Sequence, residues 1–170
     1  MDSLLRSLPD LPSSLIYLVC GLLITAETAL LPGIVLPTLS TLLLMGGLAE
    51  RGTLDLPLAL AVAVAAAVLG DQLAYLEGRR WGPRLRSSCF GRRVGDARWN
   101  RAESFIARYG LPGVIAGRFL AGVRTVVPRV AGSTAMPYRR FSAGNACAAV
   151  VWAGAELLAG HAAASLTWAR

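Results

Sequence analysis

The sequence predicts an all-helical membrane protein in which spanning helices are combined with two re-entrant helical hairpins. The 170-residue chain is 55% hydrophobic with a mean hydropathy of +0.54, which is too apolar for a soluble domain. Its apolar runs are interrupted at two places by proline, glycine and charged residues, so not every run can be an unbroken spanning helix. At this length we expect one domain, covering residues 1–170.

The first interruption follows the apolar run 11–26 and begins at Glu27. Its helix-breaking residues are Pro32, Gly33 and Pro37. Apolar character returns over 39–49, a run too short to cross a hydrocarbon core of about 30 Å. Irregular backbone at membrane depth has to be buried in protein or line a cavity. We therefore expect a re-entrant hairpin over about 27–50.

The middle of the chain predicts a spanning helix and then a basic segment. Residues 54–76 are rich in Ala and Val, with Asp71 near the end of the run. The segment of about 77–110 carries about half of the arginines, and the chain has no lysine. In a membrane protein, a cytoplasmic loop obeying the positive-inside rule explains such a segment better than nucleic-acid binding does. Within it, 99–109 has apolar residues at helical spacing, which predicts an interfacial amphipathic helix.

The second interruption, over about 111–137, contains Arg118 and Arg124. A cation at the bilayer centre costs roughly 2.5–3.5 kcal/mol on insertion scales, so it persists only beside protein, water or an anionic partner. Residues six apart lie on different faces of a continuous helix, whereas a break at Gly122 would let both arginines point at one spot. The other residues expected to shape this hairpin are Pro128 and Gly132.

The last apolar run, 141–166, predicts a second spanning helix. Asn145, early in this run, is interpreted either as a hydrogen-bonding partner of a hairpin or as a packing residue. If the basic segments face the cytoplasm, the second hairpin enters from that side and the first from the opposite side. Paired broken segments are a sequence sign of inverted repeats in transporters. We therefore expect the charges of the two hairpins to meet near the midplane.

An ordered set of motifs resembles the DedA family, also called the SNARE-associated or VTT-domain family, over roughly residues 15–165. The motifs are Glu27 before a Pro-Gly-broken loop, Gly70-Asp71-Gln72, Gly78-Arg79-Arg80-Trp81-Gly82, Gly117-Arg118-Phe119, Gly122-Val123-Arg124, Pro128, Ala131-Gly132, Met136-Pro137-Tyr138-Arg139-Arg140-Phe141, Asn145 and Trp152. No single motif is specific to this family, but the ordered set of motifs is.

The resemblance implies a multi-pass protein of the bacterial cytoplasmic (inner) membrane with two opposed re-entrant hairpins, which moves or equilibrates lipids. Bacterial members are linked to flipping of undecaprenyl phosphate or phosphatidylethanolamine and to envelope homeostasis that depends on the proton-motive force. Eukaryotic members resemble scramblases. The resemblance assigns functional roles to Glu27, Arg118 and Arg124. One feature departs from the family: Leu39 stands where a second carboxylate is usual, so the acidic side depends on Glu27 and Asp71.

These residues predict a site for a phosphate-headed membrane lipid. The guanidinium groups of Arg118 and Arg124 match phosphate oxygens, although a structural ion pair with Glu27 or Asp71 is the alternative. Glu27 would balance charge or carry a proton, and it could instead lie in interface water at a helix end. Asp71 would share the proton or charge-balancing role, or else cap its helix.

Some roles outside the two hairpin sites stay open. An ion pair of Asp71 with Arg79 or Arg80 is as well supported by the sequence as a place in the site. Arg129 is expected at the membrane interface. His161 is expected to be a packed residue.

Two other functions remain as alternatives: a proton or cation antiporter that affects lipids indirectly, and a scaffold that transports nothing. Enzymatic readings fit poorly, because the chain has a single histidine and lacks the HExxH, Gly-x-Ser-x-Gly and P-loop motifs. The three cysteines lie far apart, so we expect neither a metal nor another cofactor. Self-association into a homo-oligomer is compatible with the sequence.

Overall fold

The computed structural model describes residues 12–29, 38–89, 92, 95–120 and 123–168. These residues form helices joined by turns, with no strand among them, which confirms the all-helical class. The helices are α2 (Ser13–Ala29), α3 (Thr38–Glu50), α4 (Leu56–Trp81), α5 (Pro83–Ser87), α7 (Asp96–Tyr109), α8 (Leu111–Phe119), α9 (Val127–Ser133) and α10 (Tyr138–Trp168).

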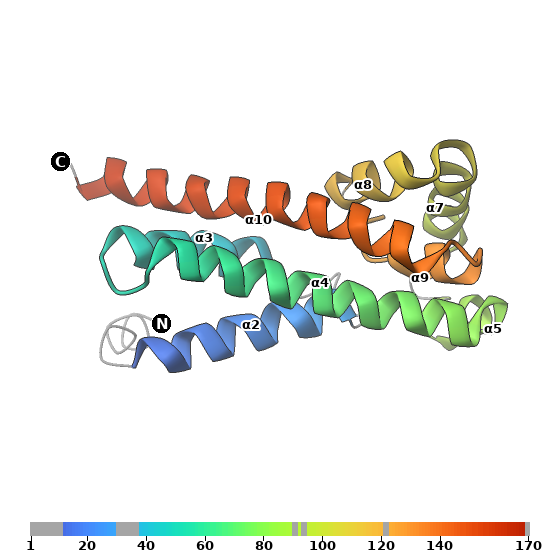
Figure 1. The fold of residues 1–170 in the computed structure, drawn as a ribbon, viewed down its shortest axis with the longest axis horizontal. Coiled ribbons are helices and arrows are strands. Elements are labelled where there is room, and N and C mark those ends of the chain that lie inside the picture. Colours follow the sequence, from blue (N-terminus) through green and yellow to red (C-terminus); the bar gives the residue numbers. More distant parts are fainter. Residues whose placement is uncertain (1–11, 30–37, 90–91, 93–94, 121–122, 169–170) are drawn as a thin grey trace.

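Helices α4 and α10 are the two elements that run along the length of the molecule (Figure 1). Both are long and apolar enough to cross a membrane, over Leu56–Trp81 and Tyr138–Leu166. Asp55 caps the start of α4 by accepting a hydrogen bond from the backbone N–H of Leu58 at 2.8 Å. The two spanning helices predicted from hydropathy are therefore present.

The shorter helices form two groups along the length of α4 and α10 (Figure 1). In one half of the molecule, α2 packs against α4 and α3 packs against α10. In the other half, α9 packs against α4, and α8 packs against α10. Each half has its own cluster of buried apolar residues, one around Leu42 and Trp152 and one around Tyr75 and Phe141.

The first predicted hairpin is described only in part. Residues 30–37, with Pro32, Gly33 and Pro37, lie outside the described residues, so the region 27–50 is represented by the end of α2 and by α3. The second, 111–137, is described except for 121–122 and consists of α8, a turn and α9. Re-entry into a membrane and the inverted relation of the two segments remain predictions.

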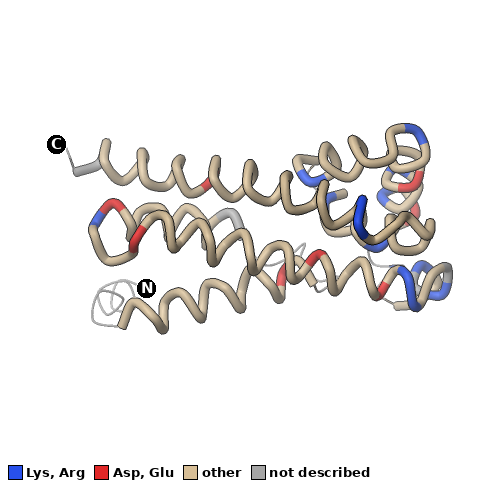
Figure 2. The backbone as a smooth tube through the Cα atoms, in the orientation of Figure 1, with Lys and Arg blue, Asp and Glu red and all other residues tan. Residues whose placement is uncertain are grey.

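The basic segment 77–110 is largely helical. It contains the end of α4 and helices α5 and α7, and Figure 2 shows the basic residues concentrated around this end of the molecule. The predicted amphipathic helix is confirmed, because α7 buries Trp99, Ala102 and Ile106 on one face.

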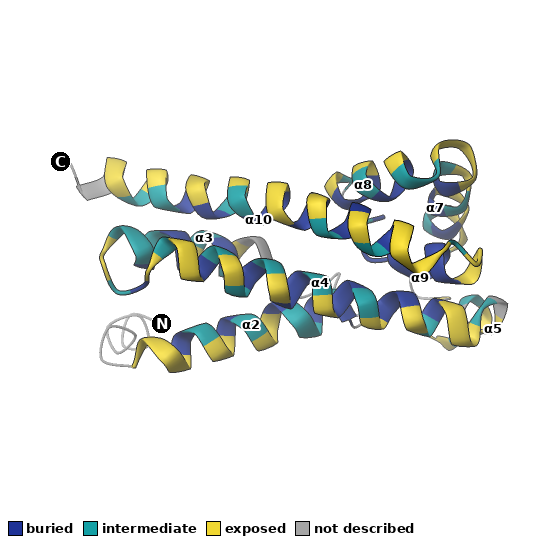
Figure 3. Ribbon diagram, in the orientation of Figure 1, coloured by how far each residue is buried: buried dark blue, intermediate teal, exposed yellow. Residues whose placement is uncertain are grey.

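The outer faces of the long helices are apolar. Large hydrophobic residues are exposed on α2, α4 and α10, among them Leu22, Leu69 and Val151. Figure 3 shows buried residues where helices meet and exposed residues on the outside. An apolar exterior of this extent suits contact with lipid tails better than contact with water.

Glycines bring the helices of each half into close contact. A Cβ on Gly78 of α4 would overlap the carbonyl oxygen of Arg129, and one on Gly132 of α9 would overlap that of Tyr75. Gly46 of α3 and Gly160 of α10 make equivalent backbone contacts in the other half. Small residues at helix contacts are typical of membrane proteins, in which close packing stabilises association.

Candidate functional site

A break between α8 and α9 positions the two arginines. Helix α8 ends at Phe119, the backbone is extended at Leu120, and residues 123–126 form a turn before α9. Pro128 lies in the first turn of α9, where its missing N–H has no helical partner to lose. Gly122 lies outside the described residues. Arg118 therefore belongs to the last turn of α8, and Arg124 belongs to the turn that follows.

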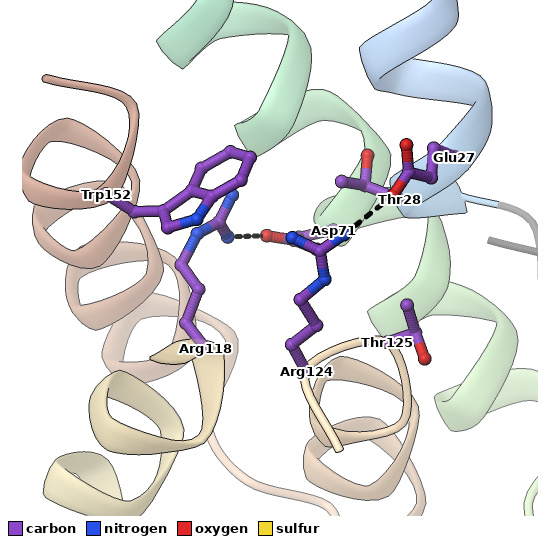
Figure 4. A pocket seen from close by; sticks show the side chains of 7 residues that line it. All are labelled: Glu27, Thr28, Asp71, Arg118, Arg124, Thr125 and Trp152. Atoms are coloured by element: carbon purple, nitrogen blue, oxygen red, sulfur yellow. Dashed lines mark hydrogen bonds and ion pairs between the residues drawn. The ribbon is translucent and has the colours of Figure 1, made fainter. Parts of the chain in front are cut away.

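Both arginines line one small cavity, with a volume of about 20 Å³, that is partly open to the outside. Its other lining residues are Glu27, Thr28, Asp71, Thr125 and Trp152. In Figure 4 the side chains of Arg118 and Arg124 extend in the same direction, with dashed lines to Asp71 and to Glu27. The cavity thus joins residues of α2, α4, α8, the turn and α10.

Arg118 is held by three partners in the interior. Its Nη1 pairs with a carboxylate oxygen of Asp71 and donates a second hydrogen bond to Asn145 Oδ1 at 2.9 Å. Its guanidinium carbon lies 5.0 Å from the ring centroid of Trp152, within cation–π range. The Arg118 side chain is 9% exposed. Asp71 is therefore a buried partner of Arg118, and of the alternatives left open for it the pairing with Arg79 or Arg80 is wrong.

Arg124 is paired more openly. Its Nη2 donates to Glu27 Oε1 at 2.7 Å, and its guanidinium carbon lies 5.5 Å from the Trp152 ring centroid. The Arg124 side chain is 29% exposed, whereas Glu27 is 2% exposed. Glu27 is thus inside the protein, and its placement in interface water is wrong. Trp152 lies within reach of both cations.

Three buried donors of this region have no recorded acceptor within the described part of the chain: Arg118 Nε, Thr125 Oγ1 and Asn145 Nδ2. Buried donors without acceptors cost about 1–3 kcal/mol each, so native proteins seldom keep them without a bound water or ligand. Two of the three belong to residues that line the cavity. The cavity can therefore offer hydrogen bonds to an additional, acceptor-rich group.

Arg129 is deeply buried, which corrects its predicted place at the interface. Its side chain is 0% exposed and pairs with Glu77 at 3.0 Å. It also donates to the carbonyl oxygens of Thr125 at 2.7 Å and Ala29 at 2.5 Å. Arg129 therefore ties α4, the end of α2 and the Arg124 turn together. Two of its acceptors, Glu77 and Ala29, come from distant segments, so no local pattern could show them.

Sequence reasoning missed Glu156. It lies on α10 one turn after Trp152, and its carboxylate interacts with the charges of Arg124 and Arg118. The available signal was a single acid inside the apolar run 141–166, since an ionisable residue in a spanning helix is a functional candidate by default.

His161 pairs with Glu50 at 2.8 Å, away from the cavity, and is partly exposed. Across the described ranges, no group of three or more His, Cys, Asp or Glu side chains is placed to hold a metal ion.

Comparisons with known proteins match this chain to membrane proteins. The VTT domain matches residues 36–162 of this chain. The inner membrane protein YghB of Escherichia coli K12 is 35% identical over 149 residues, covering 88% of this chain and 68% of YghB. An uncharacterised membrane protein of Mycobacterium tuberculosis H37Rv is 34% identical over 159 residues, covering 91% of this chain and 70% of the relative.

The E. coli inner membrane protein YqjA is 30% identical over 138 residues, covering 81% of this chain and 63% of YqjA. No solved structure matches the chain significantly. The extent of the domain match and the identity to YghB are together sufficient to show the family. This chain belongs to the DedA family of VTT-domain proteins and is a protein of the inner membrane.

Proposed function

We propose that this protein translocates phosphate-headed lipids between the leaflets of the inner membrane, as a flippase or scramblase. The observation that supports this most is the convergence of Arg118 and Arg124 on one cavity between apolar helices. Undecaprenyl phosphate and phosphatidylethanolamine are the lipids that this proposal names. Through such transport the protein would support envelope homeostasis.

The donors of the cavity suit a phosphate. A guanidinium group presents parallel N–H donors that match two phosphate oxygens, and charge-assisted hydrogen bonds are roughly twice as strong as neutral ones. The unused Nε of Arg118 and hydroxyl of Thr125 are further donors on residues that line the cavity. Lipid tails would remain against the apolar outer faces of the helices while the headgroup crosses.

The carboxylates explain how two cations are kept in the membrane without a ligand. Asp71 and Glu27 pair with Arg118 and Arg124. A headgroup that enters the cavity exchanges one of these ion pairs for an arginine–phosphate pair, so the cations are neutralised in both states. Protonation of a carboxylate in or beside this cluster as the headgroup enters would couple transport to the proton-motive force.

The test is lipid translocation by purified protein in liposomes, with a panel of fluorescently labelled headgroups, each with and without a pH gradient. We expect the wild type to accelerate translocation of the phosphate lipids. Arg124→Gln should remove most of that acceleration. The matched control is Arg140→Gln, which removes an exposed arginine at the start of α10. Unchanged translocation by the Arg124 variant would overturn the phosphate site.

The buried carboxylates also favour a second candidate, a proton or cation antiporter, because Glu27 and Asp71 face one membrane cavity. An antiporter should dissipate a pH gradient in vesicles made of a lipid that the protein does not translocate. A lipid transporter should leave that gradient unchanged. A scaffold without transport activity should tolerate both Arg118→Ala and Glu27→Ala as long as the variants fold.

A further inference from the structure

Glu156 is a carboxylate beside the cavity that the proposed phosphate site does not use. It is the only acidic residue of α10 and is half-buried. Its Oε2 atom is buried and makes no recorded hydrogen bond within the described residues. The indole of Trp152, one turn earlier, lies within hydrogen-bonding reach of the carboxylate. A carboxylate with a buried, unused oxygen at membrane depth calls for an explanation.

Among the described acids in or beside the cavity, Glu156 is the one without an ion pair to an arginine. It interacts with the charges of Arg124 and Arg118, but those arginines have Glu27 and Asp71 as their direct partners. Two arginines and three carboxylates give this cluster a net charge of −1 when all five are ionised.

Among the described residues of α3, α4 and α9, the other charged groups on the sides of this cluster are paired with one another or with His161. Residues 30–37 and 121–122, which lie outside the description, contain no ionisable side chain. The only charged residue of α3 is Glu50, which pairs with His161 of α10. On the side of α4 and α9, Arg129 and Glu77 pair with each other.

We propose that Glu156 is a proton-binding site that is coupled to the anion site, so that a phosphate headgroup binds when Glu156 is protonated. An anionic phosphate brings a further negative charge into a cluster that is already negative and of low dielectric constant. A proton on Glu156 removes one of the charges that oppose the phosphate. Glu27 and Asp71 are less suited to this role, because each is the direct counter-ion of an arginine.

The coupling is reciprocal. If protonation of Glu156 strengthens phosphate binding by some factor, phosphate binding strengthens proton binding by the same factor. Between the pH at which Glu156 titrates in the free protein and the higher pH at which it titrates in the complex, each bound monoanion then brings one proton with it. This inference rests on the proposed phosphate site, so its test has to distinguish failure of the proton coupling at Glu156 from failure of the phosphate site.

The probe is dibutyl phosphate, a soluble phosphate diester, and the measurement is isothermal titration calorimetry on the full-length protein in detergent. Titrations between about pH 5 and pH 9, in buffers of different ionisation enthalpy, give both the affinity and the number of protons taken up. For the wild type we expect affinity to fall about tenfold per pH unit on the alkaline side, with uptake of one proton.

Glu156→Gln mimics the protonated side chain. This variant should bind dibutyl phosphate at alkaline pH as tightly as the wild type does at acid pH, without proton uptake. Glu156→Asp should keep the pH dependence, which distinguishes titration from a merely structural role. Glu103→Gln, which removes a partly exposed carboxylate of α7 outside the cavity, is the control and should behave as the wild type.

The outcomes separate the two claims. Binding by the wild type without proton uptake, or the same pH dependence in Glu156→Gln, overturns the role of Glu156 and leaves the phosphate site standing. No binding of dibutyl phosphate by the wild type at any pH overturns the phosphate site and the coupling with it. Circular dichroism and size-exclusion profiles identify variants that fail to fold, and Glu156→Asp then supplies the comparison.

Discussion

The two arginines of the cavity are six residues apart in sequence but are held in very different ways. Arg118, at the end of α8, has an ion pair with Asp71, a hydrogen bond to Asn145 and little exposure. Arg124, in the turn, is three times as exposed and has an ion pair with Glu27. The comparison indicates a division of labour in which Arg118 anchors the site and Arg124 exchanges partners.

The division has a physical basis in the cost of separating each pair. Removing one member of a buried ion pair leaves an uncompensated charge, which is far more costly than loosening a pair that water or a headgroup can reach. Arg118 is therefore expected to keep Asp71 throughout transport. In the pair of Arg124 and Glu27, the arginine is the more exposed member. An incoming phosphate can therefore contact Arg124 while Glu27 remains buried.

The largest expected effect is on stability, from breaking the Arg118 pair. Asp71→Leu leaves the Arg118 cation buried without its counter-ion, and we expect a loss of about 3–5 kcal/mol in the free energy of unfolding. Thermal or denaturant unfolding in detergent measures it. The double variant Asp71→Leu/Arg118→Met should recover most of the loss, because it removes both charges. A single variant as stable as the wild type would refute the anchoring role.

The second-largest expected effect comes from the packing of α9 against α4, next to the turn that carries Arg124. Gly78→Ala places a methyl group against the backbone of Arg129, and overpacking of this kind costs about 1–3 kcal/mol. Displacing α9 should also move the Arg124 turn, so lipid translocation should fall as well. The control is Gly154→Ala on α10, whose added Cβ would meet only Leu60 Cδ1 at 4.0 Å. Equal behaviour of both variants would contradict this account of the support.

The smallest expected effect is on the second partner of Arg118. Asn145→Ala removes one hydrogen bond to a cation that keeps its ion pair, and we expect a loss of about 1–2 kcal/mol. The affinity for a phosphate diester should change little, because Arg124 and Glu27 are untouched. Unfolding and binding measured on the same preparation test this. A loss of binding greater than tenfold would place Asn145 in the phosphate site instead.

The sequence was informative where local patterns determine the geometry. The proline and glycine residues of 111–137 predicted a break, and the break lets Arg118 and Arg124 face one cavity. The position of Asp71 also follows a local pattern, because it shares the buried face of α4 with Ala74, Tyr75 and Gly78. The choice of partners did not follow, since it depends on how distant helices pack.

The wrong prediction for Arg129 and the omission of Glu156 have the same cause, the packing of segments that are distant in the sequence. Arg129 was expected at the interface, whereas the fold buries it beside Glu77 and two carbonyl oxygens, and Glu77 and Ala29 come from distant segments. Glu156 was missed although a lone acid in an apolar run is visible in the sequence. Its importance depends on the charges that α8 and the turn bring beside it.

The central claim, that a phosphate takes the place of Glu27 at Arg124, is tested most directly by the affinity of Glu27→Gln for dibutyl phosphate at fixed pH. If Glu27 competes with the ligand for Arg124, removing its charge should tighten binding about tenfold, or 1.4 kcal/mol. Glu103→Gln should leave the affinity unchanged. Weaker or unchanged binding by Glu27→Gln would show that Glu27 and the phosphate do not exchange at Arg124.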